Sequence, residues 1–464
     1  MRDREWAAVV LAMLVVIGGF GFVDEPSTAS TTVLTDGGKV TVVGDDLSFN
    51  ASTVYDRVGE MHGKDSSELP TTSVNLRERP SSAESYSPSP FEEHMGIEPE
   101  SGDTGPAAYA QGQRIVLYTD VVQTPAMREQ VLAHEMAHVI QFHENVPSRV
   151  DRGVSGFGAD ENRLQLAIVE GAATYVENQY ADKYIEESTE PPTWAERRRN
   201  RTQLGAFVLA HYHFGYRYID QRIDSVEQLD EVYDDPPQTT EQVLHGHAPD
   251  EELPAELPVT AEGLGDYSID DRRTKGELFL RVVLEGQLHL DRAAEAAAGW
   301  GNDELIAVDD GDDQPSYGWV LRWDTPADAE EFVAAKEDFL DRATGDRRNG
   351  LWRDGGVAYD VQRASEDTVV VFVGEPDVVA DASASGDYRG VTVDFGGASR
   401  VSDVAAPTGT VTAPPTASDS SSPVAPAGPT AAADSTVNGV ETGPAGARAW
   451  RVGPAVRATV AQGG

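Results

Sequence analysis

The chain has 464 residues and contains no cysteine. This absence excludes disulfide bonds, cysteine-ligated zinc, iron–sulfur clusters, thiol catalysis and lipid anchors attached through cysteine. Any metal site must therefore be built from histidine, aspartate and glutamate side chains.

Lysine is scarce, and acidic residues far outnumber basic ones. The chain has 36 Lys plus Arg against 79 Asp plus Glu, a net charge of -43, and lysine occurs only at positions 39, 64, 183, 275 and 336. Such a surface repels itself in dilute buffer but is tolerated in concentrated salt, where the Debye length falls to about 3 Å at 1 M. The composition therefore indicates adaptation to high salt, and it argues against nucleic acid as a partner.

Long apolar runs are absent apart from one near the N-terminus. Trp6–Val23 carries no charge, follows Arg2 and Arg4, and is about long enough to span a bilayer. No small-residue cleavage site follows it. We expect a membrane anchor, or alternatively a signal segment. Either would place the rest of the protein at the extracellular face of the cell membrane or in the medium.

Hydrophobic periodicity predicts a mixture of helices and strands, an α+β composition. A loop is expected at 79–106, and Gln113–Thr119 is expected to be an edge strand that could pair with an extended peptide. The aromatic residues of the third long helix are expected to pack in the core. Predicted helices are 46–61, 124–144, 161–187, 195–222, 273–289 and 326–342, and predicted strands are 71–77, 113–119, 305–308, 318–323, 356–363 and 368–373.

The segment 131–141, VLAHEMAHVIQ, contains the pattern H-E-x-x-H at His134, Glu135 and His138. On an α-helix, residues four apart share one face, so both imidazoles can reach one metal ion. Glu135 is then placed to take a proton from a metal-bound water. Thr124 is a natural N-cap for this helix and Pro125 suits its first turn. The pattern therefore predicts a zinc-dependent peptidase site.

A catalytic zinc ion needs a third protein ligand. Glu170, in AIVEGAATYVE at 167–177, is the best candidate, since it lies on the next long helix and Gly171 beside it permits close helix packing. Zinc would then be bound by His134, His138 and Glu170, with Glu135 as the base. The alternatives for the third ligand are Glu161, Glu177, His143 and His213.

Three segments resemble a known family. HEMAHVIQ, EGAATYV and PPQTTEQVLHG at 236–246 are similar, in that order, to motifs of secreted or surface-attached, gluzincin-like HExxH proteins of halophilic archaea and bacteria. The resemblance covers about 115–250 and extends weakly to 276–285, 296–305 and 323–332. It implies a zincin-like fold and a site made of His134, Glu135, His138 and Glu170.

The third of these segments has no role settled by the resemblance. A His or Tyr near the zinc could stabilise the oxyanion of a tetrahedral intermediate, with His245 the first candidate and Tyr175 the second. Alternatively, Pro236–His245 caps and packs the fold. One departure matters as well. Where relatives have Glu-Gly-Asp-Ala, this chain has Ala172 in place of Asp. If that Asp holds a ligand histidine in the relatives, its loss could weaken metal binding or activity unless another residue, such as Glu177 or Asn178, substitutes for it.

These observations predict a function for the protein and a division of the chain into four parts. The predicted function is zinc-dependent hydrolysis of a peptide or protein substrate outside the cell. The alternative is a non-catalytic surface-binding or wall-associated protein on a lapsed metallopeptidase fold. The parts are an N-terminal anchor or signal segment (1–30), a zincin-like metallopeptidase domain (31–260), a small α/β accessory domain (261–400) and a disordered tail rich in Ala, Pro, Thr and Ser (401–464).

Overall fold

The computed structural model describes residues 33–35, 38–44, 46–80, 87–98, 106–154, 159–186, 191–199, 201–265, 267–309 and 315–397. All of the described residues belong to one compact unit. The predicted anchor and the predicted tail both lie outside the described residues. Within the described ranges, no helix combines the length and the apolarity needed to cross a membrane.

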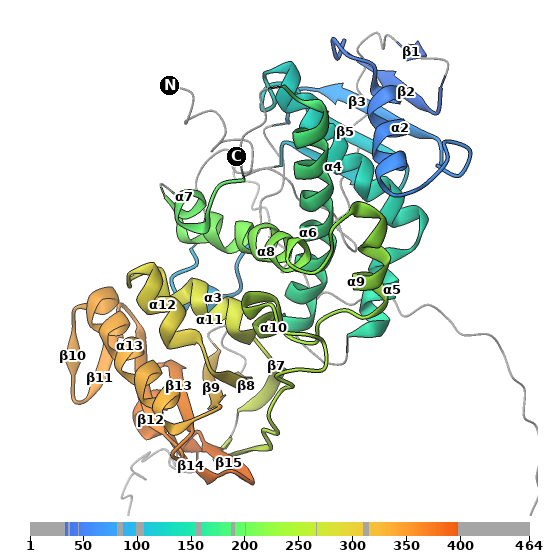
Figure 1. The fold of residues 1–464 in the computed structure, drawn as a ribbon. Coiled ribbons are helices and arrows are strands. Elements are labelled where there is room, and N and C mark those ends of the chain that lie inside the picture. The colour runs from blue at the N-terminus through green and yellow to red at the C-terminus, as the bar shows by residue number, and fades with distance from the viewer. Residues whose placement is uncertain are drawn as a thin grey trace, which may run out of the picture. The chain divides into compact units, whose positions relative to one another are not determined.

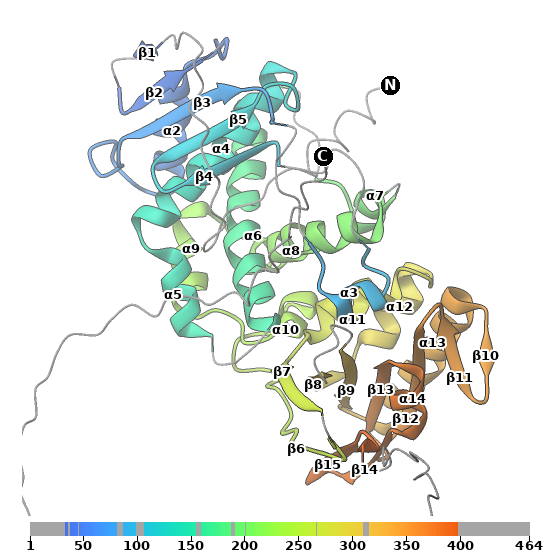
Figure 2. The same ribbon diagram turned by 180° about the vertical axis from the view of Figure 1, so that it is seen from behind.

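A mixed five-stranded sheet lies in the N-terminal part (Figure 1). Its three central strands are parallel, and the outer strand on each side is antiparallel to its neighbour. Helix α2 (Ala51–Met61), capped by Asn50, and a longer helix α4 (Pro125–His143) cover one face, and Figure 2 shows the sheet from its other side. The strand order is β1 (Val33–Thr35), β2 (Val40–Val43), β3 (Thr72–Arg77), β5 (Arg114–Tyr118) and β4 (Ala108–Gln111).

The prediction that Gln113–Thr119 is a strand is confirmed, but the prediction that it lies at the sheet edge is wrong. β5 forms as expected, but it lies between β3 and β4, so that β4 is the edge strand of this sheet. The sequence analysis had no strand at 108–111, because its three buried residues fall next to a segment expected to be a loop. The edge of the sheet that lies beside helix α4 is therefore formed by β4.

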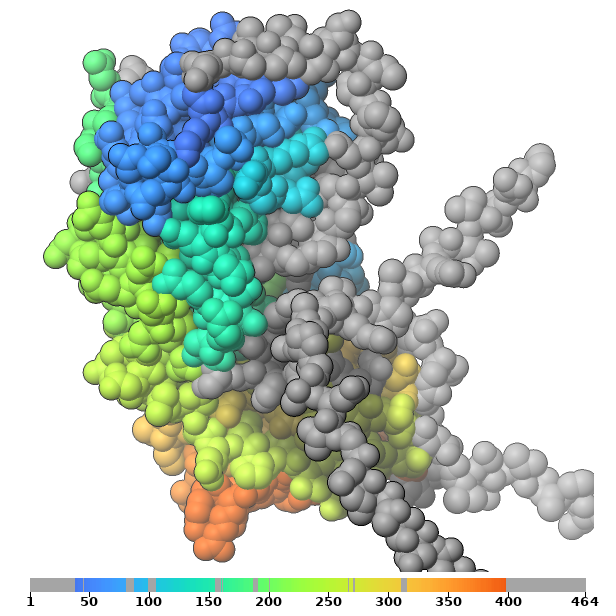
Figure 3. Space-filling view, turned by 90° about the vertical axis from the view of Figure 1, so that its right-hand side faces the viewer, coloured from blue at the N-terminus to red at the C-terminus, as the bar shows by residue number. Residues whose placement is uncertain are grey.

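The middle of the chain is helical. Two long helices, α6 and α8, pack closely on each other and α6 also contacts α4. The predicted third helix, 195–222, is divided into α7 and α8, with a break around 199–202 at which Thr202 caps α8. In Figure 3 the green residues of this part form a continuous surface with the blue residues of the N-terminal sheet. The helices are α3 (Pro90–His94), α5 (Val146–Gly153), α6 (Ala159–Tyr184), α7 (Trp194–Arg198), α8 (Gln203–Asp220), the 3-10 helix η2 (Val226–Gln228), α9 (Leu229–Asp234) and α10 (Thr240–His245).

Two glycines set the separation of α6 and α8. A Cβ atom on Gly171 would lie 2.3 Å from the backbone carbonyl carbon of Gly215, and one on Gly215 would lie 1.8 Å from the carbonyl oxygen of Ala167. Because no backbone atom can yield by that much, only glycine fits at both positions. Close helix packing at Gly171 is confirmed, but its partner is α8 and not the H-E-x-x-H helix α4 for which it was expected.

The C-terminal part contains a seven-stranded antiparallel sheet and a three-stranded sheet. Strand β13 has apolar residues on both faces, because Val369 and Val371 join the large core while Val370 and Phe372 join a smaller one. The helices here are α11 (Gly276–Leu284), α12 (Leu290–Ala297), α13 (Pro326–Thr344) and α14 (Pro376–Asp381). The sheet orders are β10 (Arg347–Arg348), β11 (Leu351–Asp354), β12 (Val357–Arg363), β13 (Thr368–Gly374), β9 (Ser316–Trp323), β8 (Trp300–Asp309) and β7 (Ser268–Arg273), and β14 (Ser383–Asp387), β15 (Gly390–Asp394) and β6 (Val259–Glu262).

The architecture is thus α+β, as predicted from the hydrophobic pattern. The predicted loop 79–106 is interrupted by the short helix α3, which a capping box between Ser89 and Glu92 begins. Phe91 of α3 packs on Phe279 and Trp319, so this insertion joins the core that extends into the C-terminal sheet.

Candidate metal centre

Helix α4 carries the H-E-x-x-H residues and begins where the sequence indicates. Thr124 accepts a hydrogen bond from the backbone N–H of Met127, and Pro125 follows at the start of the helix. The helix is covered by the sheet and by α6, so His134, Glu135 and His138 are fully buried. Burial on this scale is costly for polar groups unless they have partners.

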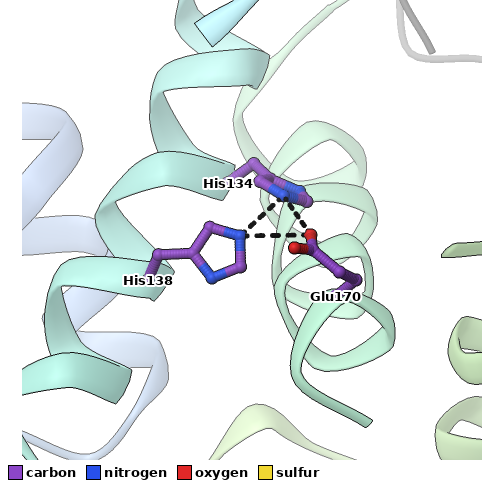
Figure 4. A group of neighbouring side chains, drawn as sticks. All are labelled: His134, His138 and Glu170. Atoms are coloured by element: carbon purple, nitrogen blue, oxygen red, sulfur yellow. Dashed lines mark hydrogen bonds and ion pairs between the residues drawn. The ribbon is translucent and has the colours of Figure 1, made fainter. Parts of the chain in front are cut away.

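The structure brings His134, His138 and Glu170 together (Figure 4). The Nε2 atoms of the two imidazoles lie 3.0 Å apart. One oxygen of Glu170, Oε2, is 3.5 Å from Nε2 of His134 and 3.3 Å from Nε2 of His138. Three candidate ligand atoms from two helices therefore converge on one point, and the group could hold a metal ion.

The outer nitrogen of His134 is fixed by a carboxylate. Its Nδ1 donates to Oε2 of Glu177 at 3.1 Å, and Gln130 donates to the other Glu177 oxygen at 2.9 Å. Glu177 lies seven residues after Glu170, two turns along the same face of α6. This is the arrangement in which a carboxylate orients a metal-binding imidazole. Of Glu177 and Asn178, the two residues named as possible substitutes for an aspartate at Ala172, Glu177 is the one that contacts His134.

The outer nitrogen of His138 is fixed by an amide. Its Nδ1 donates to Oε1 of Gln141 at 2.6 Å. Gln141 in turn donates to the carbonyl of Val169 at 3.0 Å and to the hydroxyl of Tyr233 at 3.1 Å. Sequence reasoning assigned no role to Gln141. Its place three residues after His138, one turn along the helix, was the available signal.

Glu135 differs from the groups around it. Both of its carboxyl oxygens are buried, and neither has a hydrogen-bond partner in the structure. Burial raises the pKa of this carboxyl to about 8, while His134 opposes the shift. A carboxyl group held without a partner beside three converging ligand atoms is suited to exchanging a proton with something bound there.

The charge balance of the three converging residues depends on their mutual contacts. Burial acts to lower the pKa of His134, but the carboxylates of Glu170 and Glu177 outweigh it and raise the pKa to about 10. Burial acts to raise the pKa of Glu170, but the two histidines lower it to about 2. Without a metal ion, a proton on His134 therefore supplies the positive charge that the carboxylates require.

Tyr212 is a site residue that the sequence analysis assigned to the core. Its ring stacks on His134 with centroids 6.3 Å apart. Its hydroxyl is bonded to Glu170, and burial together with the carboxylates nearby raises its pKa well above the usual value. A single tyrosine in an aromatic helix carries no pattern that separates it from core residues, so only the packing of α8 on α6 shows its position.

The other oxyanion candidates lie elsewhere. Nε2 of His245, on α10, donates to Glu277 of α11 at 2.9 Å, and the hydroxyl of Tyr175 donates to the carbonyl of Ile223 at 3.4 Å. Neither belongs to the group formed by the two histidines and Glu170. His245 therefore serves the contact between α10 and α11 in this structure.

The segment 236–246 connects α6 to α11 through hydrogen bonds made by Thr240. Thr240 donates to Asp160 at 2.6 Å, and its hydroxyl accepts from the backbone N–H of Leu278 at 3.2 Å. Gly276 faces the same point with a φ of +80°, and a Cβ atom there would lie 1.8 Å from Asp160. The packing alternative for this segment matches these contacts.

The remaining alternatives for the third ligand do not join the group. His143, at the end of α4, is exposed, and His213 packs on Trp194 with ring centroids 5.4 Å apart. The side chain of Glu161 lies outside the described residues. Glu177 contacts His134 through Nδ1, on the side away from Glu170.

Comparison with known proteins covers one part of the chain. Residues 266–385 match a family model described as a domain of unknown function, DUF8575. This range includes the seven-stranded sheet and excludes the candidate metal centre. No curated protein and no solved structure matches the chain.

Proposed function

We propose that the protein is a zinc-dependent peptidase of the gluzincin type, acting at the outside of the cell. The observation that carries the proposal is the unpartnered, buried carboxyl of Glu135 beside the converging atoms of His134, His138 and Glu170. A purely structural zinc site has no use for such a carboxyl. The exterior location rests on the apolar N-terminal run and on the resemblance to surface-attached relatives.

The three candidate ligand atoms fit zinc in type and spacing. Two imidazoles and one carboxylate are a common catalytic zinc set, with metal–ligand distances of about 2.0–2.2 Å and a tetrahedral arrangement. Two ligands at those distances lie about 3.3 Å apart in a tetrahedron. The observed separations of 3.0, 3.3 and 3.5 Å match this spacing. Because Glu177 and Gln141 bind the Nδ1 atoms of His134 and His138, both Nε2 atoms are directed at the same point.

The chain's own residues would divide the work as follows. When bound, zinc supplies a Lewis acid that polarises the scissile carbonyl and makes water ionise near neutral pH. Glu135 accepts the proton of the attacking water and delivers it to the leaving amine, which its freedom from other hydrogen bonds permits. Tyr212, bonded to Glu170 and stacked on His134, carries a hydroxyl that could stabilise negative charge on the substrate oxygen.

Substrate would align on the sheet edge next to α4. β4 (Ala108–Gln111) is the edge strand and contacts α4. An extended peptide can add to such an edge through main-chain hydrogen bonds, which bind the substrate without requiring a particular sequence. This arrangement would bring a peptide carbonyl to the helix that carries His134 and Glu135.

Two measurements test the proposal. Metal analysis of the protein purified in high salt should find one zinc ion per chain, lost in His138→Ala and Glu170→Ala. Glu135→Gln should keep that zinc but lower hydrolysis in a peptide-library screen by about 10²- to 10⁴-fold, since it removes the proton acceptor alone. Wild-type protein that binds no zinc after reconstitution, or a Glu135→Gln variant as active as wild type, would exclude this function. A zinc-loaded wild type without hydrolysis would favour the alternative of a binding protein.

A further inference from the structure

Several polar atoms without partners lie on helices α6, α7 and α8, of which α6 also carries Glu170 and Glu177. They are buried, and none has a hydrogen-bond partner in the structure: Oγ1 of Thr174, Nδ2 of Asn178, Nε and Nη1 of Arg197, and Nδ1 of His213. Buried polar groups in proteins are nearly always paired, so a concentration of exceptions requires an explanation. Arg197 is the most demanding of them, because its side chain is charged and only 8% exposed.

These groups come from three helices, and α8 packs on both α6 and α7. On α6, Glu170, Thr174 and Glu177 follow at intervals of four and three residues, so they share one face of the helix. Burial lowers the pKa of Arg197, on α7, to about 10. The carboxylate of Glu177 lies close enough to oppose part of this shift. Burial and the positive charge of Arg197 together lower the pKa of the His213 imidazole, on α8, to about 2.

Glu177 does not pair with Nε or Nη1 of Arg197, neither of which has a hydrogen-bond partner. Its Oε2 accepts from His134 and its Oε1 accepts from Gln130. The guanidinium is therefore left with unused N–H groups, and Thr174 and Asn178, within one turn of Glu177 on α6, also keep unused side-chain atoms. Because a guanidinium binds a carboxylate through two parallel hydrogen bonds, a carboxylate from outside the chain is the group that fits.

We propose that Arg197, assisted by Thr174 and Asn178, binds a carboxylate of the substrate, and that this carboxylate is the free C-terminus of a peptide. The inference rests on the proposed peptidase function, since the same peptide would present its scissile carbonyl at the metal centre. It narrows the substrate class to peptides cleaved a short distance from their C-terminal end. A neutral amide in that place would leave the guanidinium unpaired.

The test compares matched peptides by calorimetry in molar salt, using the full-length, zinc-loaded Glu135→Gln protein so that no peptide is consumed. The probes are a short blocked peptide with a free C-terminal carboxylate, the same peptide as its C-terminal amide, and the amide form with a glutamate near its end. The free acid should bind about 10- to 100-fold more tightly than the amide. Binding of the glutamate peptide like the free acid would assign the carboxylate to a side chain of the substrate instead.

The variants identify the group responsible. Arg197→Met should remove the preference for the carboxylate, and Arg197→Lys should keep part of it, because lysine retains the charge without the planar fork. Arg199→Met, on an exposed neighbour at the end of α7, should leave the preference unchanged. Thr174→Val should reduce the preference for the free acid by about 2- to 10-fold. This variant provides an independent test if Arg197→Met does not fold.

The outcomes separate this inference from the proposed function. Equal binding of acid and amide, or a preference that survives Arg197→Met, overturns the carboxylate site even if wild-type protein hydrolyses peptides. A preference that Arg197→Met removes, in a protein that hydrolyses neither peptide, supports the site and refutes the peptidase. A purely structural role for Arg197 predicts a lower melting temperature in Arg197→Met, whereas removal of an unpaired buried charge should leave it equal or higher.

Discussion

His134 donates from Nδ1 to Oε2 of Glu177 at 3.1 Å, while its Nε2 faces Glu170. One imidazole thus links the group that would bind the metal to a carboxylate two turns further along α6. This link settles the tautomer of His134 and the direction of its ring.

Glu177→Ala should weaken zinc binding without removing a ligand. We expect a loss of affinity of about 10- to 100-fold, because the His134 ring loses the bond that orients it. The zinc affinity of Glu177→Gln should lie between those of the wild type and Glu177→Ala, since its amide oxygen can still accept from Nδ1 of His134. Competition titration with a zinc indicator measures the effect. Glu186→Gln, on an exposed residue just after α6, is the control, and an affinity unchanged in Glu177→Ala would contradict the assigned role.

Metal binding should depend strongly on pH. The carboxylates raise the pKa of His134 to about 10 in the metal-free protein, so a proton must leave before zinc can bind. The apparent affinity should therefore rise by up to about tenfold per pH unit between pH 6 and 9. Calorimetry in buffers with different ionisation enthalpies should detect nearly one proton released per zinc ion. An affinity independent of pH across this interval would show that His134 is already neutral.

Gly215→Ala should destabilise the protein and disturb the metal centre. Alanine is normally favoured over glycine inside a helix by about 1 kcal/mol, but here the Cβ atom would lie 1.8 Å from the carbonyl oxygen of Ala167. We expect a net loss of about 1–3 kcal/mol in the free energy of unfolding, measured by chemical denaturation. Zinc affinity should also fall, because Glu170 and Tyr212 lie beside this contact.

Gly356→Ala serves as the matched control for this helix contact. A Cβ atom on Gly356 meets no other atom within 4 Å. Its stability should therefore equal that of the wild type or exceed it slightly. If Gly215→Ala behaves in the same way, α6 and α8 do not depend on close glycine packing.

Lys336→Met should stabilise the protein most near neutral pH. The side chain of Lys336 is completely buried, and its described contacts are the sulfur of Met95 at 3.4 Å and the Phe339 ring at 4.3 Å. Burial lowers its pKa from 10.5 to about 7. Between these values the unfolded chain holds a proton that the folded protein does not, so wild-type stability rises with pH across this window.

The gain from Lys336→Met should therefore be largest at pH 7 and below, at up to about 5 kcal/mol from 1.36 kcal/mol per pKa unit. It should shrink towards zero near pH 10.5. Denaturation midpoints of both proteins across this pH range, in the same high salt, measure the difference. Lys183→Met, on an exposed residue of α6, should show no such dependence. A gain that stays constant with pH would mean that Lys336 is charged in the folded protein throughout.

The sequence by itself determined the local features of this protein. Thr124 and Pro125 begin α4, and the four-residue spacing places His134 and His138 on one face. The alternation in 71–77 and the continuous apolar run in 368–373 predict strands. Each of these depends on near neighbours in the chain. The pairing of Glu170 with these histidines was also inferred from sequence, because it requires only that two adjacent long helices pack side by side.

Tertiary structure decided the rest. The position of β4 at the sheet edge depends on hydrogen bonds between strands, which leave no mark in a four-residue segment. The assignment of Tyr212 to the metal centre and of His245 to Glu277 depends on which face of α8 and α10 meets its neighbour. Polar and aromatic residues on a buried helix look alike in sequence whether they pack or act. Only the packing of α6 against α4 and α8 reveals which of them reach the metal centre.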